Sequence, residues 1–282
     1  MMGTVAMPST EKSNAVTATG AASEPILSVQ GLSKRYRGRA GDKLVLDGVD
    51  LEVARGEFLC IVGPSGAGKT TLLRCMSGLL APSEGAVFLD GERITKPPAR
   101  LAVVFQDYSR SLMPWMSVQG NVMLPLRSKK TPKAERTELA RSALAAVGLE
   151  ASADQYPWQL SGGMQQRVAI ARALAFQPDA LLMDEPFASV DAQTRAELED
   201  LILGLRNEFG VTVILVTHDI DEAVYLGDEV VVLSGSPTRV RERIRTDLGA
   251  QRDQITTKAL PAFAAHRTRV LRLIRNEPDV PA

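Results

Sequence analysis

The chain has few of the residues that mark secreted, metal-thiolate or membrane-spanning proteins. Its 282 residues include only two cysteines, Cys60 and Cys75, both in apolar surroundings. Two such cysteines cannot build a disulfide framework or a thiolate metal site, which favours a reducing compartment. No stretch approaches the ~18–20 apolar residues needed to cross a bilayer. We therefore expect a cytoplasmic protein, and any role at a membrane must come through a partner.

The chain also lacks an excess of either charge. Lys plus Arg and Asp plus Glu each number 33, so the net charge is zero. Nucleic-acid binding requires a basic excess or patch, so we expect no nucleic-acid partner. The dense basic cluster of the sequence lies near the C-terminus, and we interpret it as a solvated face. Its members are Arg239, Arg241, Arg243 and Arg245.

Changes in composition divide the chain into segments. Residues 1–24 are rich in Ala, Ser, Thr and Gly, lack the basic start and apolar core of a secretory signal, and are predicted to be a disordered tail. Over residues 25–234, short apolar runs alternate with helical patterns, which predicts an α/β fold with a mainly parallel sheet. Within this domain, the proline-punctuated residues 107–160 are expected to form a helical insertion. Residues 235–282 are expected to form a polar, Arg-rich extension.

The apolar runs indicate where the strands lie. Residues 26–29 and 44–53 are predicted strands around a turn at Asp47 and Gly48, at the start of an antiparallel subdomain. The continuous apolar run at 58–62 is typical of a strand buried on both faces. Further strands are expected at 86–89, 101–105, 180–183, 211–216 and 229–233, and helices at 69–79, 133–147, 194–209 and 267–274.

The strongest chemical signal is the loop that follows the strand predicted at 58–62. It reads Gly63-Pro64-Ser65-Gly66-Ala67-Gly68-Lys69-Thr70, which is G-x-x-x-x-G-K-[ST] between a strand and a helix. Glycines let the backbone wrap around a phosphate, and the helix start adds a positive end. Lys69 supplies a charge for the outer phosphates, and Thr70 a hydroxyl for Mg²⁺. The alternative is a glycine-rich turn that caps a helix, but the strand and helix around the loop favour nucleotide binding.

A second apolar strand, at 180–183, ends in two acids, Asp184 and Glu185. Charged groups at the carboxyl end of a buried strand lie where α/β sheets bind their ligands. We expect Asp184 to hold Mg²⁺, directly or through water, and Glu185 to polarise the attacking water as a general base. The alternative is a strand that stops at a solvated acidic turn. The phosphate loop in the same chain favours the catalytic interpretation.

A third motif, Leu160-Ser161-Gly162-Gly163-Met164-Gln165-Gln166-Arg167, opens a helix. Ser161 is a suitable N-cap, and the two glycines expose backbone N–H groups at the positive end of the helix. Each glycine lowers helix propensity by about 1 kcal/mol, which close approach of a phosphate would offset. The motif therefore predicts a second anion site, and the alternative is simply a capped helix.

Together these motifs, in this order, resemble the ATP-binding cassette family over residues 27–233. The resemblance implies an ATPase with a P-loop nucleoside triphosphatase fold. It further implies that Tyr36 stacks on adenine and that Gln106 senses Mg²⁺ and the attacking water and relays to a membrane partner. His218 resembles the switch histidine that contacts the γ-phosphate, and Asp191 resembles the family's aspartate at the dimer seam. The alternative for Tyr36 is an ordinary half-buried strand aromatic.

The residues so assigned fall into three groups. Nucleotide binding is expected at Tyr36, Gly63, Pro64, Ser65, Gly66, Ala67, Gly68, Lys69, Thr70, Thr71, Ser161, Gly162, Gly163, Gln165 and Asp191. Mg²⁺ binding is expected at Thr70, Gln106 and Asp184, and catalysis at Glu185, His218 and Gln106.

The resemblance also implies partners. Two copies would pair head to tail, each ATP lying between the Lys69 loop of one copy and the Ser161 helix of the other, so that association follows nucleotide state. The homodimer would act on integral membrane permease subunits, and indirectly on a periplasmic substrate-binding protein. It would lie on the cytoplasmic face of the inner membrane as a peripheral protein.

One segment narrows the resemblance to importers. Pro114 and Trp115, with Met164 and the Arg-rich tail, are similar to the ATPases of nitrate, sulfonate and taurine importers. We expect Trp115 to help form the groove for a helix of the membrane subunit; the alternative is a core residue. A rival function is a soluble cassette ATPase acting on ribosomes or DNA, which the single cassette and the lack of a long heptad insert disfavour. A non-enzymatic subunit would lack Glu185 or His218.

Overall fold

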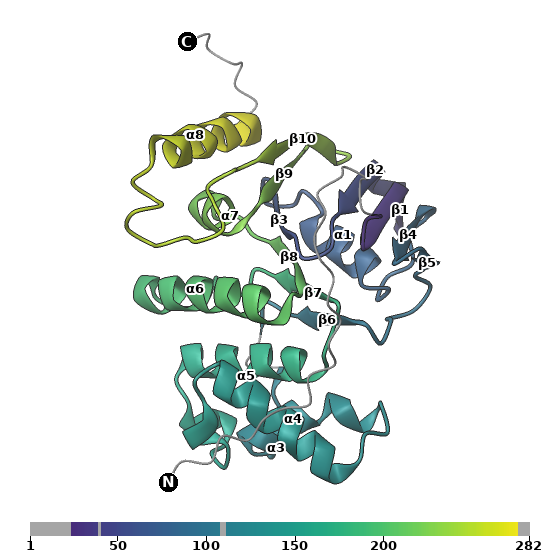
Figure 1. Ribbon diagram of the computed structural model, residues 1–282. Helices are drawn as coiled ribbons and strands as arrows, with labels where there is room; N and C mark the ends of the chain where they lie inside the picture. Colours follow the sequence, from purple (N-terminus) through teal and green to yellow (C-terminus); the bar gives the residue numbers. More distant parts are fainter. Residues whose placement is uncertain (1–23, 39–40, 108–110, 276–282) are drawn as a thin grey trace.

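The computed structural model, which describes residues 24–38, 41–107 and 111–275, consists of two β-sheets with helices packed around them (Figure 1). The smaller sheet is antiparallel and confirms the predicted antiparallel subdomain, although two of its strands follow the phosphate loop in sequence. Its strands, in spatial order, are β2 (Gly41–Val53), β1 (Leu27–Gly38), β4 (Glu84–Leu89) and β5 (Glu92–Arg93).

The larger sheet confirms the predicted α/β class. Its strands, in spatial order, are β10 (Arg239–Arg245), β9 (Glu229–Ser234), β3 (Phe58–Val62), β8 (Thr212–Val216), β7 (Ala180–Asp184) and β6 (Leu101–Val104). Every pair from β9 to β6 is parallel, and β10 alone runs antiparallel to its neighbour. Every residue of β3, β7 and β8 is buried, as expected for parallel strands covered on both faces.

Alternation along the central strands divides the apolar side chains between two cores. In β3, Phe58 and Cys60 belong to one core, and Leu59 and Ile61 to the other. The second core lies against α1 (Lys69–Met76) and the antiparallel sheet. Helices α5 (Gly162–Ala175), α6 (Ala192–Phe209), α7 (Ile220–Leu226) and α8 (Pro261–Arg275) pack on the first. Both cysteines are buried as free thiols.

The expected helices of the insertion are present, and its bounds at 107–160 stay a prediction. Helices α3 (Val118–Met123) and α4 (Lys133–Ala146) pack against α5 at the end of the molecule opposite α8 (Figure 1). Short 3-10 turns at Pro125–Arg127, Glu150–Ser152 and Pro157–Gln159 connect these helices. Ser117 caps α3 by accepting a hydrogen bond from the backbone N–H of Gly120.

The prediction of a turn at Asp47 and Gly48 is wrong. Both residues lie inside β2, and the chain reverses between Gly38 and Gly41, which face each other in the register of the hairpin. Gly48 has a φ of +60°, and the register with β1 shifts by one residue around it. A single residue in the left-handed region makes a bulge that bends the strand without reversing it.

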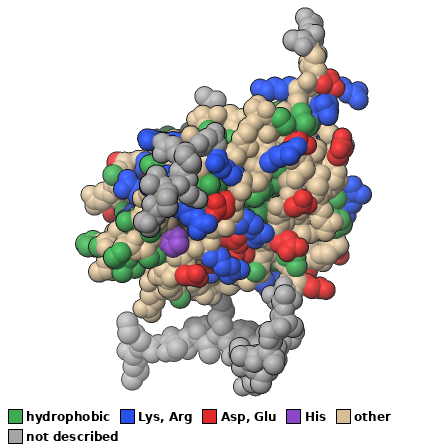
Figure 2. All heavy atoms as spheres, turned by 90° about the horizontal axis from the view of Figure 1, so that it is seen from above, with side chains coloured by type: hydrophobic (Ala, Val, Ile, Leu, Met, Phe, Trp, Pro, Cys, Tyr) green, Lys and Arg blue, Asp and Glu red, His purple; other side chains and the backbone are tan. Residues whose placement is uncertain are grey.

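The C-terminal segment continues the larger sheet. All four arginines of the basic cluster are exposed on β10, and Arg243 forms an ion pair with Glu229. On the face shown in Figure 2, Lys and Arg side chains are interspersed with Asp and Glu. Helix α8 begins at Pro261, earlier than expected. The division of the chain at residue 235 stays a prediction, and the tail predicted at 1–24 lies, but for Glu24, outside the described residues.

One arginine after β10 ties this segment to the core. The side chain of Arg252 is 3% exposed and donates to the carbonyl oxygens of Tyr225 and Gly227 at the end of α7. Its Nη2 lies 3.0 Å from Oδ1 of Asp228. We expect Arg252→Ala to lower the free energy of unfolding by about 1–3 kcal/mol, because it takes this donor from the carbonyl oxygen of Tyr225, while Thr246 still donates to Gly227 and Arg206 still pairs with Asp228. Urea unfolding followed by circular dichroism measures this change.

The matched control is Arg141→Ala, which removes an ion pair with Glu150 whose side chains are more than half exposed. We expect that variant to unfold within about 0.5 kcal/mol of the original chain. Equal unfolding midpoints for the two variants would show that Arg252 does not anchor the C-terminal segment.

Candidate functional site

The predicted catalytic residues come together because they follow neighbouring parallel strands. The phosphate loop, residues 63–70, follows β3, and His218 lies two residues after β8. Glu185 follows β7, and Gln106 lies two residues after β6. These strands are adjacent in the order β3-β8-β7-β6, so their carboxyl ends meet at one edge of the sheet.

Glycines in the phosphate loop are required by close packing and by backbone conformation. Gly68, the N-cap of α1, has a φ of +71°, and a Cβ there would lie 2.8 Å from Cγ1 of Val45. At Gly63, a Cβ would lie 2.8 Å from the carbonyl oxygen of Leu233. A side chain at either position would force the loop outwards. The sequence therefore folds here into a tight turn that directs the start of α1 into the site.

The side chain of Lys69 folds back and bonds to the start of its own loop. Its side chain is buried, and Nζ donates to the carbonyl oxygens of Gly63 at 2.9 Å and Pro64 at 3.3 Å. Burial lowers the pKa of Lys69, and the carboxylates of Glu185 and Asp184 oppose that shift. A phosphate oxygen would be a stronger partner for this ammonium than a carbonyl oxygen, because both partners would then be charged.

Thr70 and Asp184 form the candidate magnesium site. The Thr70 hydroxyl donates to Oδ1 of Asp184 at 3.2 Å, although 114 positions separate the two residues. Burial raises the pKa of Asp184, and the bond from Thr70 opposes that shift. Mg²⁺ is commonly bound by one or two carboxylates together with substrate phosphates and water. A hydroxyl and a carboxylate beside a phosphate loop fit this ion.

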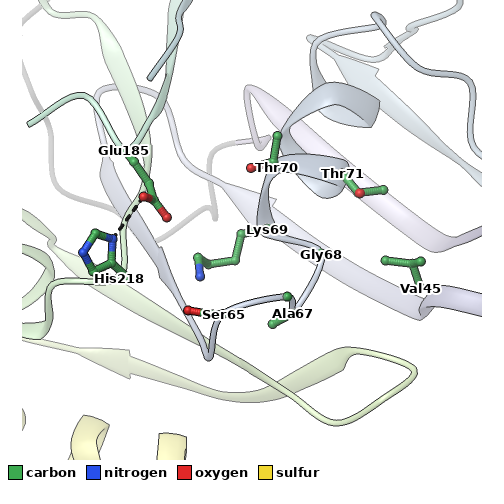
Figure 3. A pocket seen from close by; sticks show the side chains of 10 residues that line it. Val45, Ser65, Ala67, Gly68, Lys69, Thr70, Thr71, Glu185 and His218 are labelled. Carbon is green, nitrogen blue, oxygen red and sulfur yellow. Dashed lines mark hydrogen bonds and ion pairs between the residues drawn. The ribbon is translucent and has the colours of Figure 1, made fainter. Parts of the chain in front are cut away.

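The carboxylate of Glu185 is held by two side chains. Its Oε2 accepts from Nε2 of Gln106 at 3.3 Å and lies 3.1 Å from Nδ1 of His218 (Figure 3). The backbone of Glu185 has a φ of +44°, a conformation that costs a non-glycine residue about 1–2 kcal/mol. Its N–H bonds to the carbonyl oxygen of Val216 on β8 at 2.8 Å, which holds the strained turn in place. Strain of this kind is typical of functional positions.

Across the loop from this carboxylate is a cavity of about 490 Å³. Figure 3 shows Lys69 and Ser65 pointing towards the space that Glu185 and His218 face. The remaining lining residues are Val45, Gly66, Ala67, Gly68, Thr70 and Thr71. A volume in this range suits a small molecule of nucleotide size. Sequence reasoning missed Val45, because nothing local distinguishes it from the other apolar residues of β2.

Tyr36 lies beside this cavity, near the end of β1. Its side chain is 40% exposed, and its hydroxyl lies 3.4 Å from Oγ1 of Thr71 at the start of α1. The ammonium of Lys34 lies 5.5 Å from the centre of the ring. An exposed ring next to the phosphate loop is available for stacking on a base, so the adenine role stays a prediction.

The residues predicted for the second anion site do not line this cavity. Ser161 caps α5 by accepting from the N–H of Met164 at 3.3 Å. A Cβ on Gly163 would lie 2.4 Å from Cγ2 of Thr194, so this glycine allows α5 to approach α6. Gln165 donates to the carbonyl oxygens of Pro157 and Leu160.

Asp191 also lies apart from the cavity, at the start of α6. It caps that helix by accepting from the N–H and hydroxyl of Thr194. Within one chain, neither Asp191 nor the start of the Ser161 helix therefore contributes to the cavity at the Lys69 loop.

Two tryptophans of the helical insertion face outwards. Trp115 is 73% exposed, so the alternative that it is a core residue is wrong. Trp158 is 71% exposed and stacks on Tyr156 with ring centres 6.0 Å apart. Within residues 24–38, 41–107 and 111–275, no helix has the length and apolar character needed to cross a bilayer.

Comparison with known proteins reveals close relatives. The model of a family described as ABC transporter matches residues 46–188. An uncharacterized ABC transporter ATP-binding protein of Methanocaldococcus jannaschii is 47% identical over 251 residues, which cover 89% of this chain and 92% of that protein. The taurine import ATP-binding protein TauB of Chromobacterium violaceum is 45% identical over 87% of this chain and 94% of its own length. A bicarbonate transport ATP-binding protein, CmpD of Synechococcus elongatus, is 45% identical over 76% of this chain and 77% of its own.

Solved structures agree with these relatives. A dimeric ATP-binding cassette in a post-hydrolysis state, bound to ADP and Pi, superposes with a TM-score of 0.68 and 34% identity, covering 78% of this chain and 98% of that one. CbiO1 of Clostridium perfringens, part of an ABC transporter complex, superposes with a TM-score of 0.72 and 30% identity, covering 89% and 95%. These cassettes share both the fold and a substantial part of the sequence.

Proposed function

Because the chain belongs to the ABC transporter family, we propose that it is the ATP-binding and ATP-hydrolysing subunit of an importer of small anions. The observation that carries this proposal is the arrangement around the cavity, where the Lys69 loop faces the Glu185–His218 pair. One side of the site suits a triphosphate, and the other holds a carboxylate ready to activate water. The relatives described above are transport proteins, which disfavours a cassette ATPase that acts on ribosomes or DNA.

The residues of the site divide the work of hydrolysis. The backbone N–H groups of Ser65, Gly66 and residues 68–70, together with the Lys69 ammonium, hold the phosphates; the N–H of Ala67 instead donates to the carbonyl oxygen of Pro64. Thr70 and Asp184 would hold Mg²⁺, which would neutralise charge on the phosphate oxygens. Glu185 accepts a proton from the water that attacks the terminal phosphorus, and the bond to the bridging oxygen breaks to release ADP and phosphate.

Gln106 and His218 fix the direction of the Glu185 carboxylate through its Oε2. Nδ1 of His218 is engaged by this carboxylate, so Nε2 can donate to the terminal phosphate only when both ring nitrogens carry a proton. Gln106 lies after the edge strand β6 and before the helical insertion. It is therefore placed to report the state of the site to the insertion and to a permease bound there.

We further propose that two copies pair head to tail. The Ser161 helix start and Asp191 belong to the site of the opposite copy, which explains why they do not line the cavity of their own chain. A solved relative with 34% identity is dimeric with ADP and Pi. The dimer works at the cytoplasmic face of the inner membrane on permease subunits, and a periplasmic binding protein delivers the solute to them.

The solute is proposed to be a small oxyanion such as a sulfonate, taurine, nitrate or bicarbonate. Relatives named for taurine, aliphatic sulfonates and bicarbonate each match 76% or more of this chain. We expect the transporter, reconstituted in liposomes with its permease and binding protein, to import at least one of these anions when ATP is supplied on the side of this subunit. A neutral sugar and a basic amino acid are the control solutes, and ATP-dependent uptake of only the controls would exclude the anion proposal.

A further inference from the structure

Two helices begin at residues of the proposed site, and one arginine joins their first turns. Helix α6 starts after its N-cap Asp191, and helix α7 starts after Asp219, the neighbour of His218. Arg195, four residues into α6 from its cap, places Nη1 3.1 Å from Oδ2 of Asp219. This ion pair is a direct side-chain link between the turn that carries Asp191 and the turn that carries His218.

Asp219 uses its two carboxylate oxygens for different tasks. Oδ1 caps α7 by accepting from the N–H groups of Asp221 at 2.9 Å and Glu222 at 3.2 Å, while Oδ2 pairs with Arg195. The backbone N–H of Asp219 donates to Oγ1 of Thr217 at 3.0 Å. A rotation of this carboxylate would therefore disturb the helix cap and, with it, the backbone next to His218.

The residue on the other side of His218 is also fixed. Thr217 is buried, and its N–H donates to the carbonyl oxygen of Ile61 on β3 at 3.1 Å. His218 itself is exposed, with 59% of its side chain accessible, and its ring contacts Glu185 alone among the hydrogen bonds of the described residues. The orientation of His218 thus depends on its two neighbours in the chain. Thr217 is held by the backbone of β3, and Asp219 is held by the side chain of Arg195 from α6.

Arg195 also faces an acidic cluster behind the site. Asp219, Glu222 and Glu199 surround the space between α6 and α7, and Glu222 and Glu199 are buried. Burial raises the pKa of Glu222 to about 8, and its bond with Thr217 opposes that shift. Glu199 has its own partner, because Nζ of Lys258 lies 3.4 Å from it. Without Arg195, Asp219 would lose its ion-pair partner while still facing these carboxyl groups.

We propose that Arg195 is a positioning residue for the reaction, which holds Asp219 so that His218 stays directed at Glu185. This inference rests on the proposed function, in which Glu185 and His218 are the reacting groups. Arg195 does not line the 490 Å³ cavity; it lines a smaller cavity of about 40 Å³ together with His218 and Asp219, so we assign its effect to these residues and not to the nucleotide. A shift of the first turn of α6, where Asp191 lies, can reach His218 through this ion pair.

The kinetic test compares Arg195→Met, which keeps the length of the side chain and removes its charge, with Arg195→Lys. We expect Arg195→Met to lower kcat by roughly 10- to 100-fold, because small displacements of reacting groups have effects of this size. KM for ATP should change by less than about two-fold, because the phosphate loop is untouched. Arg195→Lys should recover most of the rate. The matched control, Arg55→Met, removes an exposed ion pair with Asp90 on the antiparallel side and should leave kcat unchanged.

A second measurement separates this inference from the proposed function. The chain contains two histidines, His218 in the site and His266 on α8. In nucleotide-free protein, Arg195→Met should shift or broaden the ring Cε1–Hε1 signal of His218 and leave that of His266 in place. Asp219→Asn keeps an oxygen to cap α7 and weakens the ion pair, so it should reproduce this signature if Arg195→Met does not fold.

Each outcome decides a different point. An unmoved His218 signal together with an unchanged kcat in Arg195→Met would overturn the positioning role. A rise in KM alone would overturn it as well, because the arginine would then act on nucleotide binding. If the original chain hydrolyses no ATP, the proposed function fails, and the histidine signals still show whether Arg195 orients His218.

Discussion

Replacement of Lys69 by Met is expected to raise the dissociation constant for Mg-ATP by roughly 100- to 1,000-fold, the effect of truncating one partner of a desolvated charge pair. The Lys69 ammonium is buried and already directed across the mouth of the phosphate loop by Gly63 and Pro64. A triphosphate in the cavity would therefore meet a preorganised positive charge, and methionine retains the stem of the side chain without that charge. Isothermal titration calorimetry with Mg-ATP measures the change.

Stability provides the check on this prediction. Burial disfavours the charged form of Lys69, and an apolar replacement of a buried charge is often neutral or stabilising, so Lys69→Met should unfold at the same urea concentration as the original chain or a higher one. Lys133→Met, at the exposed start of α4, is the matched control and should bind Mg-ATP normally. A Lys69→Met protein that binds Mg-ATP as tightly as the original chain would remove the basis for the nucleotide site.

Replacement of Glu185 by Gln is expected to lower kcat by about 10²–10⁴-fold, the usual contribution of a general base, while nucleotide binding persists. Glutamine has nearly the same shape, so contacts with Gln106 and His218 can be kept, but it cannot take the proton from water. It also removes a negative charge close to Asp184 and to the place of the terminal phosphate. The steady-state release of phosphate by the purified chain measures the loss of rate.

The same variant tests the proposed pairing of two copies. If ATP joins the copies and hydrolysis releases them, Glu185→Gln should form a stable dimer with ATP and Mg²⁺, visible by size-exclusion chromatography with light scattering. Glu150→Gln, an exposed change in the helical insertion, should hydrolyse ATP and should not accumulate as a dimer. A Glu185→Gln protein that stays monomeric with ATP argues against the head-to-tail arrangement, and one that keeps the original rate argues against the general base.

Between them, Lys69 and Glu185 probe the two sides of the cavity separately. If the loop binds ATP without Glu185, and Glu185 cannot act without Lys69, then binding and chemistry are separable. The loop after β3 would bind the nucleotide, and the carboxylate after β7 would carry out hydrolysis. The Arg195 experiment tests a residue outside the cavity, because the substitution alters neither the phosphate loop nor Glu185 directly. Loss of rate with ATP affinity retained would locate its effect in the alignment of His218 with Glu185.

Local patterns were sufficient for much of the fold and for the phosphate loop. Strands β3, β7 and β8 were predictable because burial on both faces requires continuous apolar runs, and the strand expected at 211–216 starts one residue later at Thr212. The loop at residues 63–70 was predictable because its proposed function depends on backbone N–H groups and a helix start, which are properties of adjacent residues. The turn expected at Asp47 and Gly48 failed because a glycine with positive φ serves a bulge as readily as a turn.

The sequence by itself therefore determined the class of fold, the phosphate loop and the acid pair, since each is encoded by neighbouring residues. Only the tertiary structure decided which distant residues meet. It joined Oε2 of Glu185 to both Gln106 and His218, brought Val45 to the cavity, and linked Arg195 to Asp219. The physical reason is that the order of parallel strands and the packing of α6 against α7 set these distances, and neither leaves a mark in the spacing of residues along the chain.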